Sequence, residues 1–70
     1  MPNFEIYYRE HDGRLVEKLS VDCATPKHAK IIAHAMKVHP GTEIEVWLED
    51  SLVYARPPRW DAAESRLGLF

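Results

Sequence analysis

The chain has 70 residues, one cysteine and a formal net charge of -2 with histidine neutral, and 46% of its residues are hydrophobic. These values predict one small folded domain, exclude an internal disulfide, and give no overall attraction to nucleic acid or to an anionic membrane. No apolar run approaches the ~20 residues of a membrane span and no charged-then-apolar leader opens the chain, so we expect a cytoplasmic protein without membrane contact.

The first element predicted along the chain is a β-hairpin. Residues 4–9 alternate and are rich in β-formers, and Asp12-Gly13 is a strong two-residue turn signal because both turn positions need positive φ. Pairing outward from that turn places Arg9 opposite Val16, Tyr7 opposite Lys18, Ile6 opposite Leu19 and Phe4 opposite Val21. This register separates an apolar face (Phe4, Ile6, Tyr8, Leu19 and Val21) from a polar one (Glu5, Tyr7, Arg9, Val16, Lys18 and Ser20).

A helix over residues 26–38 follows. Thr25 is a good N-cap, Pro26 suits the first helical position, and Pro40-Gly41 favours an ending. Helical periodicity places Ala29, Ile32, Ala33 and Met36 on one stripe, predicted to face the core. The opposite stripe is a basic ridge of Lys27, Lys30, His34 and Lys37. We interpret this ridge as a solvated face; a phosphate-binding role is the alternative, but three lysines are too few to be specific.

A second hairpin is predicted after the helix. Ile44, Val46 and Leu48 alternate with polar residues and Trp47, and Asp50-Ser51 is taken as the turn, although it is a weaker signal than Asp-Gly. This turn pairs Leu48 with Val53, Trp47 with Tyr54, Val46 with Ala55 and Glu45 with Arg56. Trp47, Tyr54 and Arg56 are therefore expected on the sheet face away from the helix.

The element order β-β-α-β-β predicts an α+β fold. Strands two and three should run parallel with a right-handed crossover, and placing strand one between them gives the antiparallel order 2-1-3-4 with the helix on one face. The domain is expected to span residues 1–58, with a tail over residues 59–70. Asp61 and Glu64 have the spacing of a capping box, so the tail is a candidate short helix that packs on the domain or on a partner.

The sheet face away from the helix, called the open face below, is the candidate binding surface. It is predicted to carry aromatic and basic side chains: Tyr7, Arg9, Lys18, Trp47, Tyr54 and Arg56, joined by Trp60 from the tail. Because protein interfaces are enriched in such residues, we interpret it as a protein-interaction surface, with a homodimer or another protein as partner. The alternative is a nucleic-acid-binding sheet, on which aromatic rings stack against bases. That reading is weakened by the strand order, by the absence of an RNP motif and by three acidic residues on or near this face: Glu5, Glu45 and Glu49.

Metal binding and catalysis have little support in the sequence. Cys23 and the histidines show no paired-ligand spacing, and His28 and His39 are too far apart along the helix to share a zinc. Cys23 near the helix start, with His28 as a base, lacks a third orienting group and is better read as a small buried hydrophobe. We therefore predict no enzymatic activity, no metal and no cofactor.

The segments Phe4-Glu-Ile-Tyr-Tyr8, Ala29-Lys-Ile-Ile-Ala33 and Glu43-Ile-Glu-Val-Trp47, followed by Leu52-Val53, cover most of residues 3–56. In this arrangement the chain resembles short uncharacterised bacterial ββαββ proteins with a Glu-x-Trp strand. The helix of this chain is more basic than is usual in them. The resemblance implies a free-standing cytoplasmic domain and assigns no activity and no catalytic residue.

Overall fold

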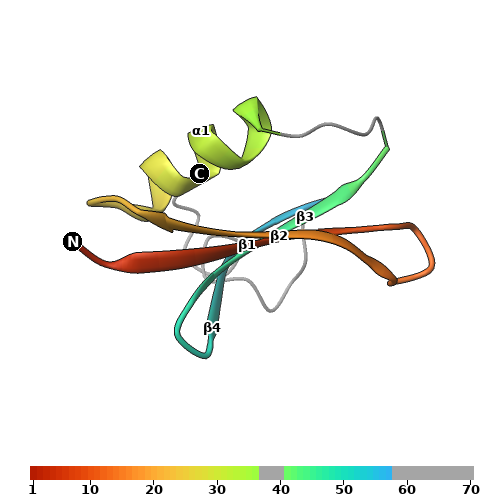
Figure 1. Ribbon diagram of the computed structural model, residues 1–70, viewed down its shortest axis with the longest axis horizontal. Helices are drawn as coiled ribbons and strands as arrows, with labels where there is room; N and C mark the ends of the chain where they lie inside the picture. The colour runs from red at the N-terminus through yellow and green to blue at the C-terminus, as the bar shows by residue number, and fades with distance from the viewer. Residues whose placement is uncertain (37–40, 58–70) are drawn as a thin grey trace.

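The computed structural model describes residues 1–36 and 41–57. Within these residues four strands form one antiparallel sheet in the order β2-β1-β3-β4, with the helix on one face (Figure 1). The elements are β1 (Asn3–Arg9), β2 (Leu15–Asp22), α1 (Pro26–Ala35), β3 (Glu43–Leu48) and β4 (Ser51–Arg56). The predicted α+β fold, its ββαββ order and its strand order are confirmed.

The first hairpin keeps the predicted register along most of its length but turns differently. Phe4 pairs with Val21 and Tyr7 with Lys18 as expected, whereas Arg9 pairs with Leu15 because a bulge leaves Val16 without a partner. Gly13 N–H donates to the Glu10 carbonyl at 2.8 Å, and Gly13 alone in this loop has positive φ, at 93°. The loop is therefore the three-residue type, a turn followed by a left-handed glycine, and the predicted two-residue turn is wrong.

The helix begins as predicted and ends earlier. The Thr25 side chain accepts a hydrogen bond from the His28 N–H at 3.1 Å, and Pro26 occupies the first turn. The helix ends at Ala35, not at residue 38, and Met36 is 53% exposed instead of lying in the core. The stripe predicted from the helical repeat therefore includes one residue too many: Ala33 is the last buried residue of the helix, and Met36, almost one turn later, is not in the core.

The second hairpin turns one residue earlier than predicted. Leu48 pairs with Ser51, so Glu49 and Asp50 form the loop, and Glu49 has a φ of 55°. A bulge at Val53 then shifts the register, and Tyr54 pairs with Val46. Because strand side chains alternate between faces, the extra residue of this bulge moves Tyr54 to the helix side of the sheet, whereas the earlier turn alone would have left it on the open face. Val53 and Tyr54 both join the core cluster under α1.

The core lies between α1 and the sheet. Its strand side chains come mainly from the two central strands and are fully or almost fully buried: Phe4, Ile6, Tyr8, Ile44 and Val46. The helix contributes Ala29 and Ala33, whose small side chains allow it to approach the sheet closely. The Tyr8 hydroxyl donates to the Ala33 carbonyl at 2.5 Å and so ties the end of the helix to β1. Burial, and secondarily the Glu17 carboxylate, raises the pKa of Tyr8 above its ordinary value of 10.0.

Candidate interaction surface

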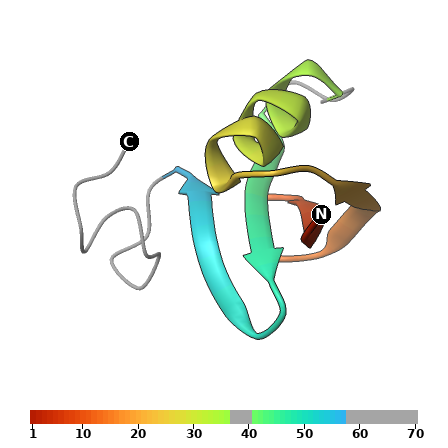
Figure 2. The same cartoon turned by 90° about the vertical axis from the view of Figure 1, so that its left-hand side faces the viewer.

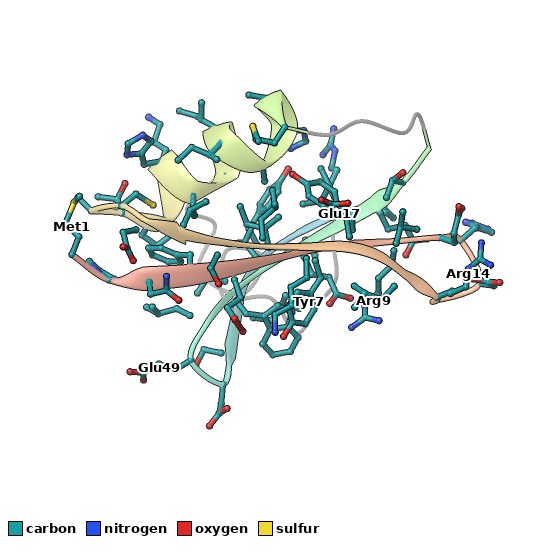
Figure 3. The ribbon with its side chains drawn as sticks, in the orientation of Figure 1. Met1, Tyr7, Arg9, Arg14, Glu17 and Glu49 are labelled. Carbon is teal, nitrogen blue, oxygen red and sulfur yellow. The ribbon has the colours of Figure 1, made fainter. Side chains whose placement is uncertain are left out.

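Tyr7 and Trp47 lie together on the open face, as the sequence predicts. Tyr7 is central on β1 and Trp47 is on the neighbouring β3, in the diagonal position next to Glu45, the direct partner of Tyr7. Their ring centroids are 6.4 Å apart with the planes tilted by 35°, within the range for favourable aromatic pairs. Figure 3 shows Tyr7 and Arg9 on the side of the sheet opposite α1, whereas Glu17 is on the helix side.

Glu45 organises the centre of this face. Its side chain is almost buried, and one carboxylate oxygen, Oε1, accepts hydrogen bonds from Arg9 Nε at 3.2 Å and from Trp47 Nε1 at 3.0 Å. A buried carboxylate that holds both a guanidinium and an indole fixes the orientation of both groups. From the sequence alone, Glu45 is expected only to pair with Arg56 and to repel phosphate. The signal that was available is the Glu45-x-Trp47 spacing, which places both side chains on one face of a strand.

Two cations lie over the ring of Tyr7. Arg9 Cζ is 5.4 Å from the ring centroid and Lys18 Nζ is 5.6 Å from it, both within cation–π distance. Each cation also has a carboxylate neighbour, Glu45 for Arg9 and Glu5 for Lys18, the latter at 3.6 Å. The positive charges of the open face are therefore already balanced by carboxylates on the same face.

The open face has two parts with different exposure. On the β4 side Leu52 and Ala55 are buried, and Trp47 packs against them. On the β1–β2 side Tyr7 is half-buried and the Lys18 side chain is 51% exposed. The accessible part of the face therefore consists of the half-buried Tyr7 and Trp47 rings with charged side chains around them.

Two residues that were predicted for the open face, Tyr54 and Arg56, lie on the helix side of the sheet. Tyr54 is buried on the helix side, where its hydroxyl is 2.6 Å from His34 Nε2 and Lys30 Nζ is 5.2 Å from its ring centroid. Arg56 pairs with Ile44 and also lies on the helix side. On the predicted basic ridge, Lys27 and His34 are exposed and Lys30 is half-buried, and both Lys30 and His34 also contact Tyr54 of β4. Trp60 and Lys37 lie outside the described residues.

The described residues contain no group of three or more histidine, cysteine, aspartate or glutamate side chains placed to hold a metal ion. Cys23 is buried, as predicted, with its thiol 3.7 Å from the Thr25 carbonyl, while His28 is exposed. In the same part of the chain, no helix has both the length and the apolar character needed to cross a membrane. Comparisons with protein-family models, with curated proteins and with solved structures find no match.

Proposed function

We propose that this protein is a non-enzymatic protein-interaction module and that the Tyr7–Trp47 pair on the open face is the centre of its contact surface. The observation that carries the proposal is the fixed aromatic pair: Glu45 holds Trp47 and Arg9, and Arg9 in turn lies over the Tyr7 ring. Rigid Tyr, Trp and Arg side chains at the middle of a surface are the groups that dominate binding energy at protein interfaces.

The composition of this surface favours a partner of a particular kind. Interfaces of proteins that bind and separate are no more apolar than the rest of the surface, whereas permanent homodimer interfaces are more apolar. The accessible part of the open face consists of the half-buried Tyr7 and Trp47 rings with Lys18, Arg9 and Glu5 around them, so most of its side chains are polar. The proposed partner is therefore a different folded protein that presents an apolar side chain with polar groups around it.

Nucleic acid is a weaker candidate for the same surface. Phosphate binding needs cations that are available to replace counterions. Arg9 and Lys18 are already paired with Glu45 and Glu5, and Arg56 is on the other side of the sheet. We expect a single-stranded oligonucleotide titration to show no binding at low or at physiological salt. Salt-sensitive binding that is lost in Arg9→Ala would contradict the proposal.

Site-specific cross-linking tests the proposal directly. A photoreactive phenylalanine replaces Tyr7, and a control protein carries it at Lys27, which is exposed on the helix. We expect a cross-linked partner in extract of the source organism only with the probe at position 7, and its loss when Trp47→Ala is added. The partner identified in this way is then purified and its binding to the unlabelled chain is measured by calorimetry.

The calorimetric measurement gives the decisive number. Truncation of a central aromatic anchor typically weakens binding by about 2 kcal/mol or more, which is roughly a thirtyfold rise in Kd. We expect this effect for Trp47→Ala and no effect for Lys27→Ala. Equal affinity of the wild-type protein and Trp47→Ala, or a cross-link that forms equally well from position 27, would show that the open face is not the contact surface.

A further inference from the structure

The two edges of the sheet differ in how well they are protected against pairing. On β4, a bulge at Val53 breaks the regular pairing and Pro57, which has no N–H, follows the strand. Bulges and prolines are the features that prevent an edge from adding another strand. Among the described strands β2 is the longest, with 8 residues, and its bulge at Val16 is beside the turn. The segment 18–22 therefore remains a regular edge without proline.

Backbone alternation shows which groups of β2 point outward. The Cys23 N–H donates to the Pro2 carbonyl at 3.1 Å, so the backbone of Cys23 points toward the β1 side. In an antiparallel pair every second residue points the same way, which assigns Leu19 and Val21 to the β1 side as well. The N–H and C=O groups of the residues between them point away from the sheet: Lys18, Ser20 and Asp22.

The helix side of this edge is apolar and only partly covered. α1 packs over β3, β1 and β4, and in Figure 2 it lies above the green β3 and near the cyan β4, with the orange-brown β2 at the opposite edge. Leu19 and Val21 are only partly buried against the core. On the helix, Lys30 and His34 mark the flank toward β4, so at 100° per residue Ile32 and the exposed Met36 are on the flank toward β2.

We propose that two copies of this chain pair antiparallel through their β2 edges, with Ser20 of one copy opposite Ser20 of the second. In this register Lys18, which also contacts Glu5 at 3.6 Å, lies opposite Asp22 of the second copy, whose carboxylate also accepts a hydrogen bond from Asn3 at 2.9 Å, so opposite charges meet on the open face. Leu19 lies opposite Val21 of the second copy, which completes an apolar cluster on the helix side. All the outward-pointing backbone groups of Lys18, Ser20 and Asp22 then find partners, because each such pair exchanges two hydrogen bonds.

Registers that slide toward the turn are less favourable. Sliding by one residue to place Leu19 opposite Leu19 brings Glu17 opposite Val21, a charge against an apolar side chain. Sliding further places Lys18 opposite Lys18, and like charges directly opposite each other destabilise a strand pair. The exposed Glu17 on the helix side thus restricts pairing to the segment 18–22. The resulting dimer has two-fold symmetry, one continuous sheet and two open faces side by side.

This self-association goes beyond the proposed function and does not depend on it, because it uses the sheet edge and not the Tyr7–Trp47 pair. The first test is the solution mass by light scattering over a concentration series, on the wild-type protein and on Ser20→Pro. We expect the wild-type protein to have twice the chain mass of 8.1 kDa. Ser20→Pro removes an outward N–H while leaving the β1–β2 bonds in place, so we expect a folded monomer by circular dichroism. A wild-type monomer up to millimolar concentration would overturn the proposal, as would an unchanged dimer in a folded Ser20→Pro.

Charge reversal gives a second test that does not depend on a proline. Lys18→Glu and Asp22→Lys each place like charges opposite one another in the dimer, and we expect each to raise the dimer Kd by about tenfold at low salt. Mixing the two variants brings Glu against Lys and Lys against Asp, so a heterodimer with restored affinity is expected. The double variant Lys18→Glu/Asp22→Lys is expected to dimerise like the wild-type protein. Failure of both the mixture and the double variant to recover dimerisation would overturn the proposed register.

Discussion

Replacing Tyr8 with phenylalanine removes one buried hydrogen bond and leaves the ring in place. The Tyr8 hydroxyl donates to the Ala33 carbonyl at 2.5 Å, and Tyr8 is 3% exposed. Loss of a buried hydrogen bond, with the carbonyl left unpaired, lowers the free energy of unfolding by about 1–2 kcal/mol. For a domain of this size that corresponds to a fall in Tm of about 5–10 °C at neutral pH.

The effect of Tyr8→Phe also depends on pH. Burial raises the pKa of Tyr8 above 10.0, so below that value the hydroxyl is neutral in both the folded and the unfolded chain. At higher pH the unfolded chain loses the Tyr8 proton while the folded chain keeps it, and the stability contributed by the hydroxyl is lost as pH rises toward the raised pKa. The stability difference between the wild-type protein and Tyr8→Phe is therefore expected to be full at pH 7 and to shrink above pH 10.

Urea denaturation followed by tryptophan fluorescence, at one fixed protein concentration and at several pH values, measures this difference. Tyr7→Phe is the matched control, because the Tyr7 hydroxyl is only part-buried and its hydrogen bond to Glu5 Oε1 is weak, at the outer distance limit of 3.5 Å. We expect the control to change the free energy of unfolding by less than about 0.5 kcal/mol. A Tyr8→Phe protein as stable as the wild type at neutral pH, or a difference that does not change with pH, would refute the reasoning.

Three further predictions follow from individual contacts. Gly13→Ala is expected to lower the free energy of unfolding in urea by about 1 kcal/mol, because φ is 93° there, while the open space around the site excludes a clash. His34→Ala removes the 2.6 Å contact with the Tyr54 hydroxyl and should lower the Tm, whereas Lys27→Ala on the same helix should not. Trp47→Ala is expected to leave the dimer Kd unchanged in sedimentation experiments. The first prediction would be wrong if Gly13→Ala left the free energy of unfolding unchanged, and the second if His34→Ala and Lys27→Ala had equal Tm values. The third would be wrong if Trp47→Ala were monomeric.

The strand order and the first hairpin could be predicted because several local signals agree there. Alternation in β1, the Asp12-Gly13 pair and the Thr25-Pro26 helix start each fix one part of the chain, and together they leave few topologies. The predicted register of the first hairpin is correct although the predicted turn is wrong, because the bulge at Val16 offsets the extra loop residue. The predicted face is also correct for Tyr7 and Trp47, because they lie on the two central strands, β1 and β3.

The face of Tyr54 could not be predicted, because the second hairpin has no comparable signal. The loop begins at Glu49, which adopts a φ of 55° that is uncommon for a residue other than glycine. Because glutamate is not a turn signal, the sequence predicts the turn one residue later, at Asp50-Ser51. No residue pattern in the sequence predicts the bulge at Val53. This bulge moves each of the β4 residues that follow it to the opposite face of the sheet from the one predicted. What decides the register is tertiary packing: the Tyr54 hydroxyl meets His34, and Leu52 and Ala55 are buried with Trp47.

The most direct test of the account is the solution mass of three proteins measured side by side by light scattering. Self-association is proposed to use the β2 edge, and partner binding is proposed to use the open face. We therefore expect a dimer for the wild-type protein, a dimer for Trp47→Ala and a folded monomer for Ser20→Pro. A dimer that persists in Ser20→Pro and separates in Trp47→Ala would contradict this expectation, and would show that the open face is the surface through which the chain associates with itself.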